Sequence, residues 1–139
     1  MSVVLELKSR GLAQAVDELV PKALQGTKVF LKSAQIAKNL QGNLGYGAVE
    51  FRRGLAFLHA KVDELSEPRA SLGISQDGLD PGVRAQERVF VVVLFLKPPR
   101  DPGFEVPLWA RRKLCNERTI YRLRTAPDLD AVLHILRST

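Results

Sequence analysis

The sequence has few of the residues that cross-link small domains or bind metal ions. Its 139 residues include one cysteine, Cys115, and two histidines, His59 and His134. A single thiol forms no internal disulfide, and one thiol with two histidines far apart in sequence is a poor ligand set for zinc. We therefore expect no metal site, and we expect Cys115 to be a small buried hydrophobic residue, as free cysteines usually are.

Long apolar segments are also missing. The longest near-continuous apolar run, 89–96, is far shorter than the roughly 20 residues that a membrane-spanning helix needs. Residues 1–10 lack the charged leader and apolar stretch that are typical of a secretory signal. We therefore expect no membrane span and a cytoplasmic location.

Composition and length are those of one globular domain. The chain is 45% hydrophobic and its mean hydropathy is −0.05. Domains cluster at roughly 100 to 150 residues, and the chain has no repeat, low-complexity tract or linker-like segment, so we predict a single domain over 1–139. A net charge of +6 favours an acidic partner surface or a polyanion and does not choose between them.

The first part of the chain shows a strand followed by two helices. Residues 3–7 alternate as in a strand, and residues 12–20 have helical spacing that Pro21 is expected to end or kink. Ser33 is expected to cap a second helix, which a glycine-rich loop over 42–47 would close.

The middle of the chain is typical of strands. Residues 55–62 and 70–75 form strand-like runs separated by a turn at 67–69, and this arrangement suggests a hairpin. Residues 76–86 contain turn formers and are expected to form a surface loop. Residues 89–96 are apolar on both faces, which is typical of a central strand covered on both sides.

The last part of the chain is typical of helices. Prolines and a glycine over 98–103 stop the long strand. A helix containing Trp109 is expected next, with the indole as a core residue. A final amphipathic helix is expected from about Asp128, with His134 as an ordinary helix residue. Strands and helices alternate around a buried strand, so the predicted fold class is α/β.

A basic stretch over 111–124 raises the question of nucleic-acid or membrane-surface binding. It carries six positive charges and one acid, Glu117. Aromatic residues for base stacking are few, with Trp109 and Tyr121 nearby. A solvated helix face is therefore favoured, and we do not expect nucleic acid as a partner.

The most specific motif lies at 54–61, which reads Gly-Leu-Ala-Phe-Leu-His-Ala-Lys. It resembles the Gly-hydrophobic-Ala-hydrophobic-Pro-His-Ala-basic motif of the fructose/mannitol-type (type 2) IIA domain of the sugar phosphotransferase system, whose relatives include nitrogen-regulatory IIA proteins. Residues 72–75 and 77–80 look like the family's short strand and turn, and 89–96 follows in the expected order. The resemblance covers about residues 10–137.

The resemblance implies a fold and a function. The fold would be a mixed sheet flanked by helices on both faces. His59 would accept a phosphoryl group from an HPr-like phosphocarrier protein and pass it to a IIB domain or a regulated target protein, without a cofactor. A neutral imidazole has the nucleophilicity for this transfer. Lys61 would share a strand face with His59, and Lys61, Arg52 and Arg53 are the expected phosphate-stabilising residues.

Two positions depart from the family pattern. Leu58 stands where the family usually has proline before the acceptor histidine, and we expect Leu58 and Gly54 to belong to the pocket. Many members carry a second active-site histidine just after the long strand, where this chain has Phe104 and Glu105. These departures leave an alternative open, in which the chain is a non-catalytic regulatory module that keeps the IIA fold and binds a protein partner.

Overall fold

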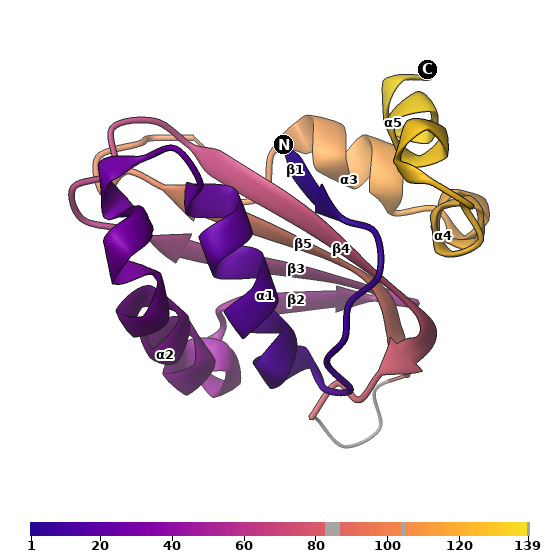
Figure 1. Ribbon diagram of the computed structural model, residues 1–139, viewed down its shortest axis with the longest axis horizontal. Coiled ribbons are helices and arrows are strands. Elements are labelled where there is room, and N and C mark those ends of the chain that lie inside the picture. Colours follow the sequence, from indigo (N-terminus) through magenta and orange to yellow (C-terminus); the bar gives the residue numbers. More distant parts are fainter. Residues whose placement is uncertain (83–86, 104, 139) are drawn as a thin grey trace.

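The computed structural model describes residues 1–82, 87–103 and 105–138. In these ranges the chain forms a five-stranded mixed sheet with helices on both faces (Figure 1). This confirms the α/β class and the mixed, doubly covered sheet. No helix among the described residues is long and apolar enough to cross a membrane. The elements are β1 (Ser2–Val4), α1 (Leu12–Leu24), η1 (Lys28–Lys32), α2 (Ser33–Asn43), η2 (Leu44–Tyr46), β2 (Val49–Arg52), β3 (Leu55–Lys61), β4 (Arg69–Leu79), β5 (Val89–Lys97), α3 (Leu108–Leu114), α4 (Glu117–Arg124) and α5 (Leu129–Arg137).

Strand β5 is the middle strand of the sheet, whose order is β1-β4-β5-β3-β2. It pairs in parallel with β3 and antiparallel with β4. At the two edges, β1 is parallel to β4 and β2 is antiparallel to β3. The prediction of a central strand at 89–96 is therefore confirmed.

The two faces of β5 belong to separate cores, because successive side chains of a strand point to opposite sides. Val92, Leu94 and Leu96 pack with the buried residues of α1 and α2. Val91 and Val93 pack on the other side with those of α3, α4 and α5. A strand covered in this way has no polar face, which explains its continuous apolar run.

The predicted hairpin between 55–62 and 70–75 is wrong. Strand β5 lies between β3 and β4, because the most apolar strand takes the position where both faces and both edges are covered. The predicted loop over 76–86 is also wrong in its first part, since β4 continues to Leu79 beyond a register irregularity that follows Ile74. Residues 83–86 of that loop lie outside the described residues.

Several predicted helix boundaries differ from the structure. Helix α1 continues through Pro21 to Leu24, because Ala23 and Leu24 are buried in the core. Ser33 is the first residue of α2 rather than its cap, and its hydroxyl donates a hydrogen bond to the Phe30 carbonyl. The segment expected as a loop at 42–47 is mostly helical.

Two residues expected in the core are more exposed than predicted. Trp109 is 47% exposed, and Cys115 is exposed. Helix α3 has only seven residues and turns Ala110 and Leu114 to the core, so Trp109 lies at its side and Cys115 follows its end. The indole still meets the Phe95 ring edge-on, with the ring centroids 6.4 Å apart. The last helix begins as predicted, with the Asp128 carboxylate accepting a hydrogen bond from the Ala131 N–H.

The central strand should dominate the stability of the fold. Because the Leu94 side chain is fully buried, Leu94→Ala is expected to lower the free energy of unfolding by about 2 to 5 kcal/mol. Urea denaturation measures this change. Leu31 is 91% exposed, so the control Leu31→Ala should stay within about 0.5 kcal/mol of wild type. Equal losses in the two variants would contradict this description of the core.

Candidate functional site

His59 lies near the carboxyl end of β3, on the face covered by α3. Its neighbour in β5 is Phe95, and its backbone N–H donates a hydrogen bond of 3.1 Å to the Ala48 carbonyl. The side chain is 17% exposed. Parallel strands end at the same edge of a sheet, and the carboxyl ends of such strands are where α/β proteins bind ligands. His59 is therefore held rigidly at its main chain and is open to solvent at its ring.

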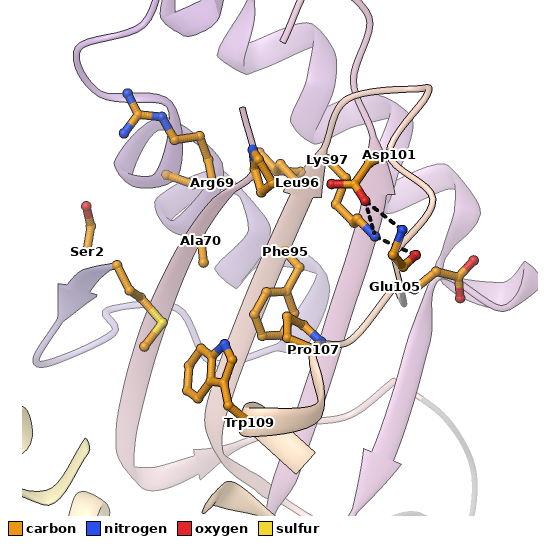
Figure 2. Close-up of a pocket in the computed structure, with 14 residues that line it drawn as sticks. Ser2, Arg69, Ala70, Phe95, Leu96, Lys97, Asp101, Glu105, Pro107 and Trp109 are labelled. Carbon is orange, nitrogen blue, oxygen red and sulfur yellow. Dashed lines mark hydrogen bonds and ion pairs between the residues drawn. The ribbon is translucent and has the colours of Figure 1, made fainter. Parts of the chain in front are cut away.

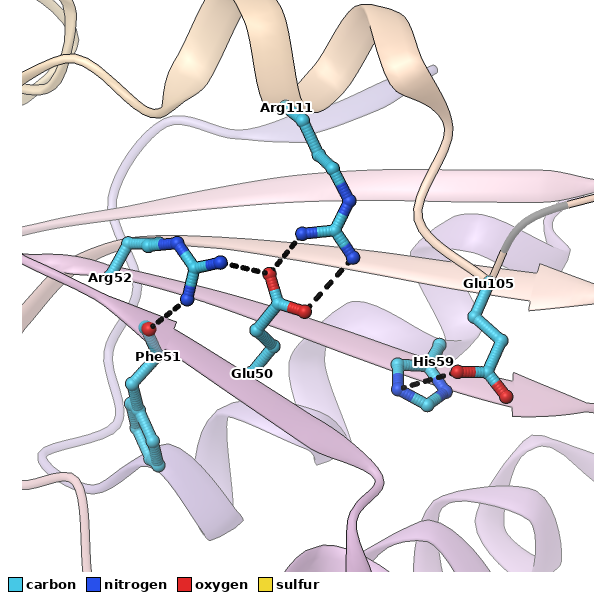
Figure 3. A network of polar contacts seen from close by, with 6 residues as sticks. All are labelled: Glu50, Phe51, Arg52, His59, Glu105 and Arg111. Atoms are coloured by element: carbon cyan, nitrogen blue, oxygen red, sulfur yellow. Dashed lines mark hydrogen bonds and ion pairs between the residues drawn. The ribbon is translucent and has the colours of Figure 1, made fainter.

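Glu105 contacts the His59 ring (Figure 3). Its Oε2 atom lies 3.5 Å from Nε2 of His59, and its side chain is 67% exposed. Glu105 belongs to the segment between β5 and α3, at the place where the IIA resemblance would put a second histidine. The sequence marks Glu105 as a departure from the family pattern, but it does not predict this contact. Phe104, the other residue at that place, lies outside the described residues.

Lys97, the last residue of β5, holds this segment on the sheet (Figure 2). Its side chain is 9% exposed, and Nζ lies 3.4 Å from Oδ1 of Asp101. Nζ also donates a 2.8 Å hydrogen bond to the Gly103 carbonyl. The Gly103 N–H donates in turn to Oδ1 of Asp101 at 2.7 Å. We call this group of Lys97, Asp101 and Gly103 the lysine clip.

The Asp101 carboxyl of the lysine clip is ionised near neutral pH. The hydrogen bond from the Gly103 N–H is the main cause that lowers the pKa of Asp101, and Lys97 and Lys61 lower it further. The carboxylate is therefore ionised and pairs with the ammonium group of Lys97. No pattern in the sequence identified Lys97.

A second carboxylate, Glu50, lies on the same face of the sheet as His59. Glu50 is in β2 opposite Phe57 of β3, and Arg111 of α3 donates hydrogen bonds to both of its oxygens (Figure 3). Arg52 adds an ion pair at 3.4 Å. The hydrogen bond from Arg111 is the main cause that lowers the pKa of Glu50, and the charges of Arg111, Arg52 and His59 contribute to the same shift. The negative charge of Glu50 is thus offset by two arginines.

The predicted phosphate-stabilising residues are placed differently from one another. Lys61 is two residues after His59 in β3, so it shares the same face, and it lies opposite Lys97 in β5. Arg52 contacts Glu50 and the Phe51 carbonyl. Arg53 pairs with Glu117 at 2.8 Å, near the start of α4. Within the described residues, neither arginine contacts His59.

The two predicted pocket residues lie away from the ring of His59. Gly54 is in the turn between β2 and β3 with φ of 72°, and a Cβ there would meet the Phe90 ring at 3.2 Å. It is at the amino end of β3. Leu58 is fully buried among the residues that pack on α1 and α2, because neighbouring residues of a strand point to opposite faces.

A cavity of about 460 Å³ opens beside the site (Figure 2). Glu105 and Lys97 line it together with the two aromatic rings of Phe95 and Trp109, and Arg69 lines it from β4. Within the part of the chain that the structure describes, no group of three or more histidine, cysteine or acidic side chains is placed to hold a metal ion.

Comparison with solved structures supports the fold. The chain is similar to the mannitol-specific cryptic phosphotransferase enzyme IIA CmtB from Escherichia coli, known from its solution structure, with a TM-score of 0.65 and 16% sequence identity. The similarity covers 98% of this chain and 90% of that protein. No protein-family model matches the sequence, and no curated protein matches it. The fold is therefore like that of a phosphotransferase-system enzyme IIA.

The Glu50–Arg111 pair should make stability depend on pH. The pKa of Glu50 is lower in the folded chain than its ordinary value of 4.5. The pair therefore stabilises the fold above about pH 4.5, and this contribution is lost as the pH falls through the folded pKa. Glu50→Gln should cost about 1 kcal/mol at pH 7, and its difference from wild type should shrink below pH 4.5.

Urea unfolding at a series of pH values measures this difference. Glu117→Gln is the matched control, because Glu117 is 69% exposed in its pair with Arg53. A cost that stays the same from pH 7 to pH 3 for Glu50→Gln would contradict the assignment.

Proposed function

We propose that this chain is a phosphotransferase-system IIA-like phosphocarrier or regulatory domain. His59 accepts a phosphoryl group from an HPr-like phosphocarrier protein and passes it to a IIB domain or a regulated target protein. The observation that carries the proposal is a partly exposed imidazole at the carboxyl ends of two parallel strands, in a fold similar to that of an enzyme IIA. The proposal treats residues 1–139 as one cytoplasmic domain that needs no cofactor.

Phosphoryl transfer needs a nucleophile and positive groups near the phosphoryl oxygens. A ring nitrogen of neutral His59 uses its lone pair to form the new N–P bond while the donor's N–P bond breaks, and the donor's imidazole keeps the electron pair of that bond. Positive groups nearby stabilise the charge of the phosphoryl oxygens during transfer. Lys61 shares the face of His59 and supplies such a charge in the proposal.

The acceptor role predicts a covalent change. After incubation with phosphoenolpyruvate, enzyme I and HPr, intact-mass analysis should show a gain of one phosphoryl group, about 80 Da. His59→Ala should abolish the gain, whereas His134→Ala should keep it, because His134 lies on the exposed side of α5. A gain that survives in His59→Ala, or the absence of any gain in wild type, would reject His59 as the acceptor.

Lys61 should assist transfer modestly. Because Lys61 is exposed, and exposed charge pairs contribute about 0.2 to 1 kcal/mol, Lys61→Met should slow phosphorylation of His59 roughly two- to fivefold. Lys38 is also exposed and lies on α2, so Lys38→Met is the control with the same loss of charge. The measurement is the initial rate of phosphate incorporation from phosphorylated HPr. Equal rates in all three proteins would remove Lys61 from the site.

A second candidate function is a non-catalytic regulatory module that binds a protein partner through the same fold. The contact between the Glu105 carboxylate and the His59 ring favours it, since a negative group beside the acceptor opposes the arrival of a phosphoryl dianion. This candidate predicts no phosphate gain in wild type and equal affinity of wild type and His59→Ala for a regulated target protein, measured by calorimetry. Phosphate-dependent binding would contradict it.

A further inference from the structure

A groove of about 290 Å³ lies between α2 and the end of β3 (Figure 1). Its two walls are joined at both ends. At one end Lys32 pairs with Glu64. At the other, the Ala48 N–H donates a hydrogen bond to the Asn43 carbonyl, and the Ala48 carbonyl accepts one from the His59 N–H. Helix α2 therefore runs beside the chain from His59 to Glu64 in the opposite direction.

The last residue of β3 turns its main-chain groups away from the centre of the sheet. Successive residues of a strand bond alternately to the strands on its two sides. The His59 N–H bonds on the β2 side, to the Ala48 carbonyl, whereas the Val62 N–H bonds on the β5 side, to the Lys97 carbonyl at 2.8 Å. The N–H and carbonyl of Lys61 therefore face the β2 side, like those of His59.

Strand β2 does not reach far enough to cover this edge. It begins at Val49, and the chain before it turns away at Gly47, which has φ of 97°. Among the strands of the described residues, none pairs with Lys61 on this side. Lys61 is exposed and lines the groove, so the groove contains a short, open strand edge.

The opposite wall carries three side-chain amides. Gln35, Asn39 and Asn43 follow one another at four-residue spacing along one face of α2, and all three are exposed and line the groove. Nε2 of Gln35 donates to Oδ1 of Asn39, and Nδ2 of Asn43 donates to the Asn39 carbonyl, each at 2.9 Å. An amide nitrogen has two hydrogens, so each side chain keeps a donor for a ligand. We call these three residues the amide ladder.

The spacing of the amide ladder suits an extended chain. Four residues of helix advance by about 6 Å, and two residues of an extended chain advance by about 6.6 Å. A side-chain amide also has a donor and an acceptor, as a peptide group does. Asn39 and Asn43 are poor helix formers, and Gly42 between them is poorer still. Helix stability therefore does not account for the residues on this face.

The floor of the groove is apolar. Val29, Leu40 and Val62 are buried there, and Ile36 and Ala60 are half-buried beside them. In an extended ligand, alternate side chains point to opposite sides. One set would contact this floor, and the other set would face solvent.

We propose that this groove binds an extended segment of a protein partner, which adds a short strand to the open edge of β3 at Lys61 and contacts the amide ladder. Main-chain hydrogen bonds provide affinity in such strand addition, and pockets for alternate side chains provide specificity. The segment has apolar side chains at alternate positions, because the floor is apolar. This inference does not depend on the acceptor function, since His59 is not among the residues that line the groove.

The first test uses synthetic peptides of about seven residues, capped at both ends, in which serine alternates with valine or with leucine. Nitrogen-15 NMR of the labelled protein should show shifts of the Lys61 main-chain amide and of the Asn39 and Asn43 side-chain amides. At saturation, hydrogen exchange at the Lys61 N–H should slow about fivefold or more.

The matched control peptides carry the same side chains and are N-methylated at alternate residues. They cannot donate main-chain hydrogen bonds at those residues, so they should bind at least about threefold more weakly. Equal binding of methylated and unmethylated peptides would overturn the proposal. So would shifts that leave Lys61 and the amide ladder unchanged, or the absence of binding by every peptide.

Two variants test the two walls separately. Asn39→Leu removes one amide and keeps a good helix former, and it should weaken peptide binding about three- to tenfold. Gln14→Leu is its control, because Gln14 is an exposed amide of α1 outside the groove. Lys61→Pro removes the outward N–H at a strand edge, where proline is tolerated, and should weaken binding by a similar factor. Lys61→Met keeps that N–H and should bind as wild type does. Unchanged affinity in folded Asn39→Leu or folded Lys61→Pro would overturn the proposal.

Two further measurements separate this proposal from its alternatives. Sedimentation at increasing concentration should show a monomer, whereas a dimer that the peptides dissociate would assign the groove to a second copy of this chain and overturn the proposal. His59→Ala should bind the peptides as wild type does. Loss of phosphorylation and loss of peptide binding are therefore independent results.

Discussion

The parallel pairing of β3 with β5 determines where each group of the site lies. Its register places His59 opposite Phe95 and Lys61 opposite Lys97. Parallel strands end at one edge of a sheet, so the imidazole, both lysines and the segment that follows β5 meet there. The pairing exists because β5 is apolar on both faces and occupies the middle of the sheet. A change in register would move His59 to the opposite face or away from Glu105.

The charged side chains near the imidazole fall into two groups: the arginines that pair with Glu50, and Glu105, which contacts the ring. Arg111 joins α3 to the edge strand β2 through Glu50, and Arg52 adds to the same carboxylate. Glu105 remains directed at His59. The result is a histidine with a positive side chain, Lys61, on the same face of its own strand and a negative one, Glu105, beside its ring.

Local patterns in the sequence predicted the elements that depend on local chemistry. The apolar run at 89–96 predicted the central strand, and Asp128 predicted the start of α5. The motif at 54–61 singled out His59 and its strand. The mixed sheet covered on both faces was expected from the resemblance and was found.

The sequence did not predict features that depend on pairing between segments far apart along the chain. Strand β2 has only four residues, two apolar and two charged, and it forms because β3 supplies its hydrogen bonds. The hairpin between β3 and β4 was an error because short apolar runs do not reveal which strand lies between them. The contact of Glu105 with His59 depends on the path of the chain after β5, which Lys97 sets through Gly103. No spacing in the sequence encodes that path.

Return of the phosphoryl group to its donor tests the central claim most directly, because a carrier must release what it accepts. Phosphorylated protein, freed of donors, would be mixed with an equal amount of unphosphorylated HPr, and phosphate on both proteins would be followed by mass analysis. The account predicts that phosphate appears on HPr as it leaves His59. Phosphate that stays on the protein until it is lost to water as inorganic phosphate would contradict the carrier function.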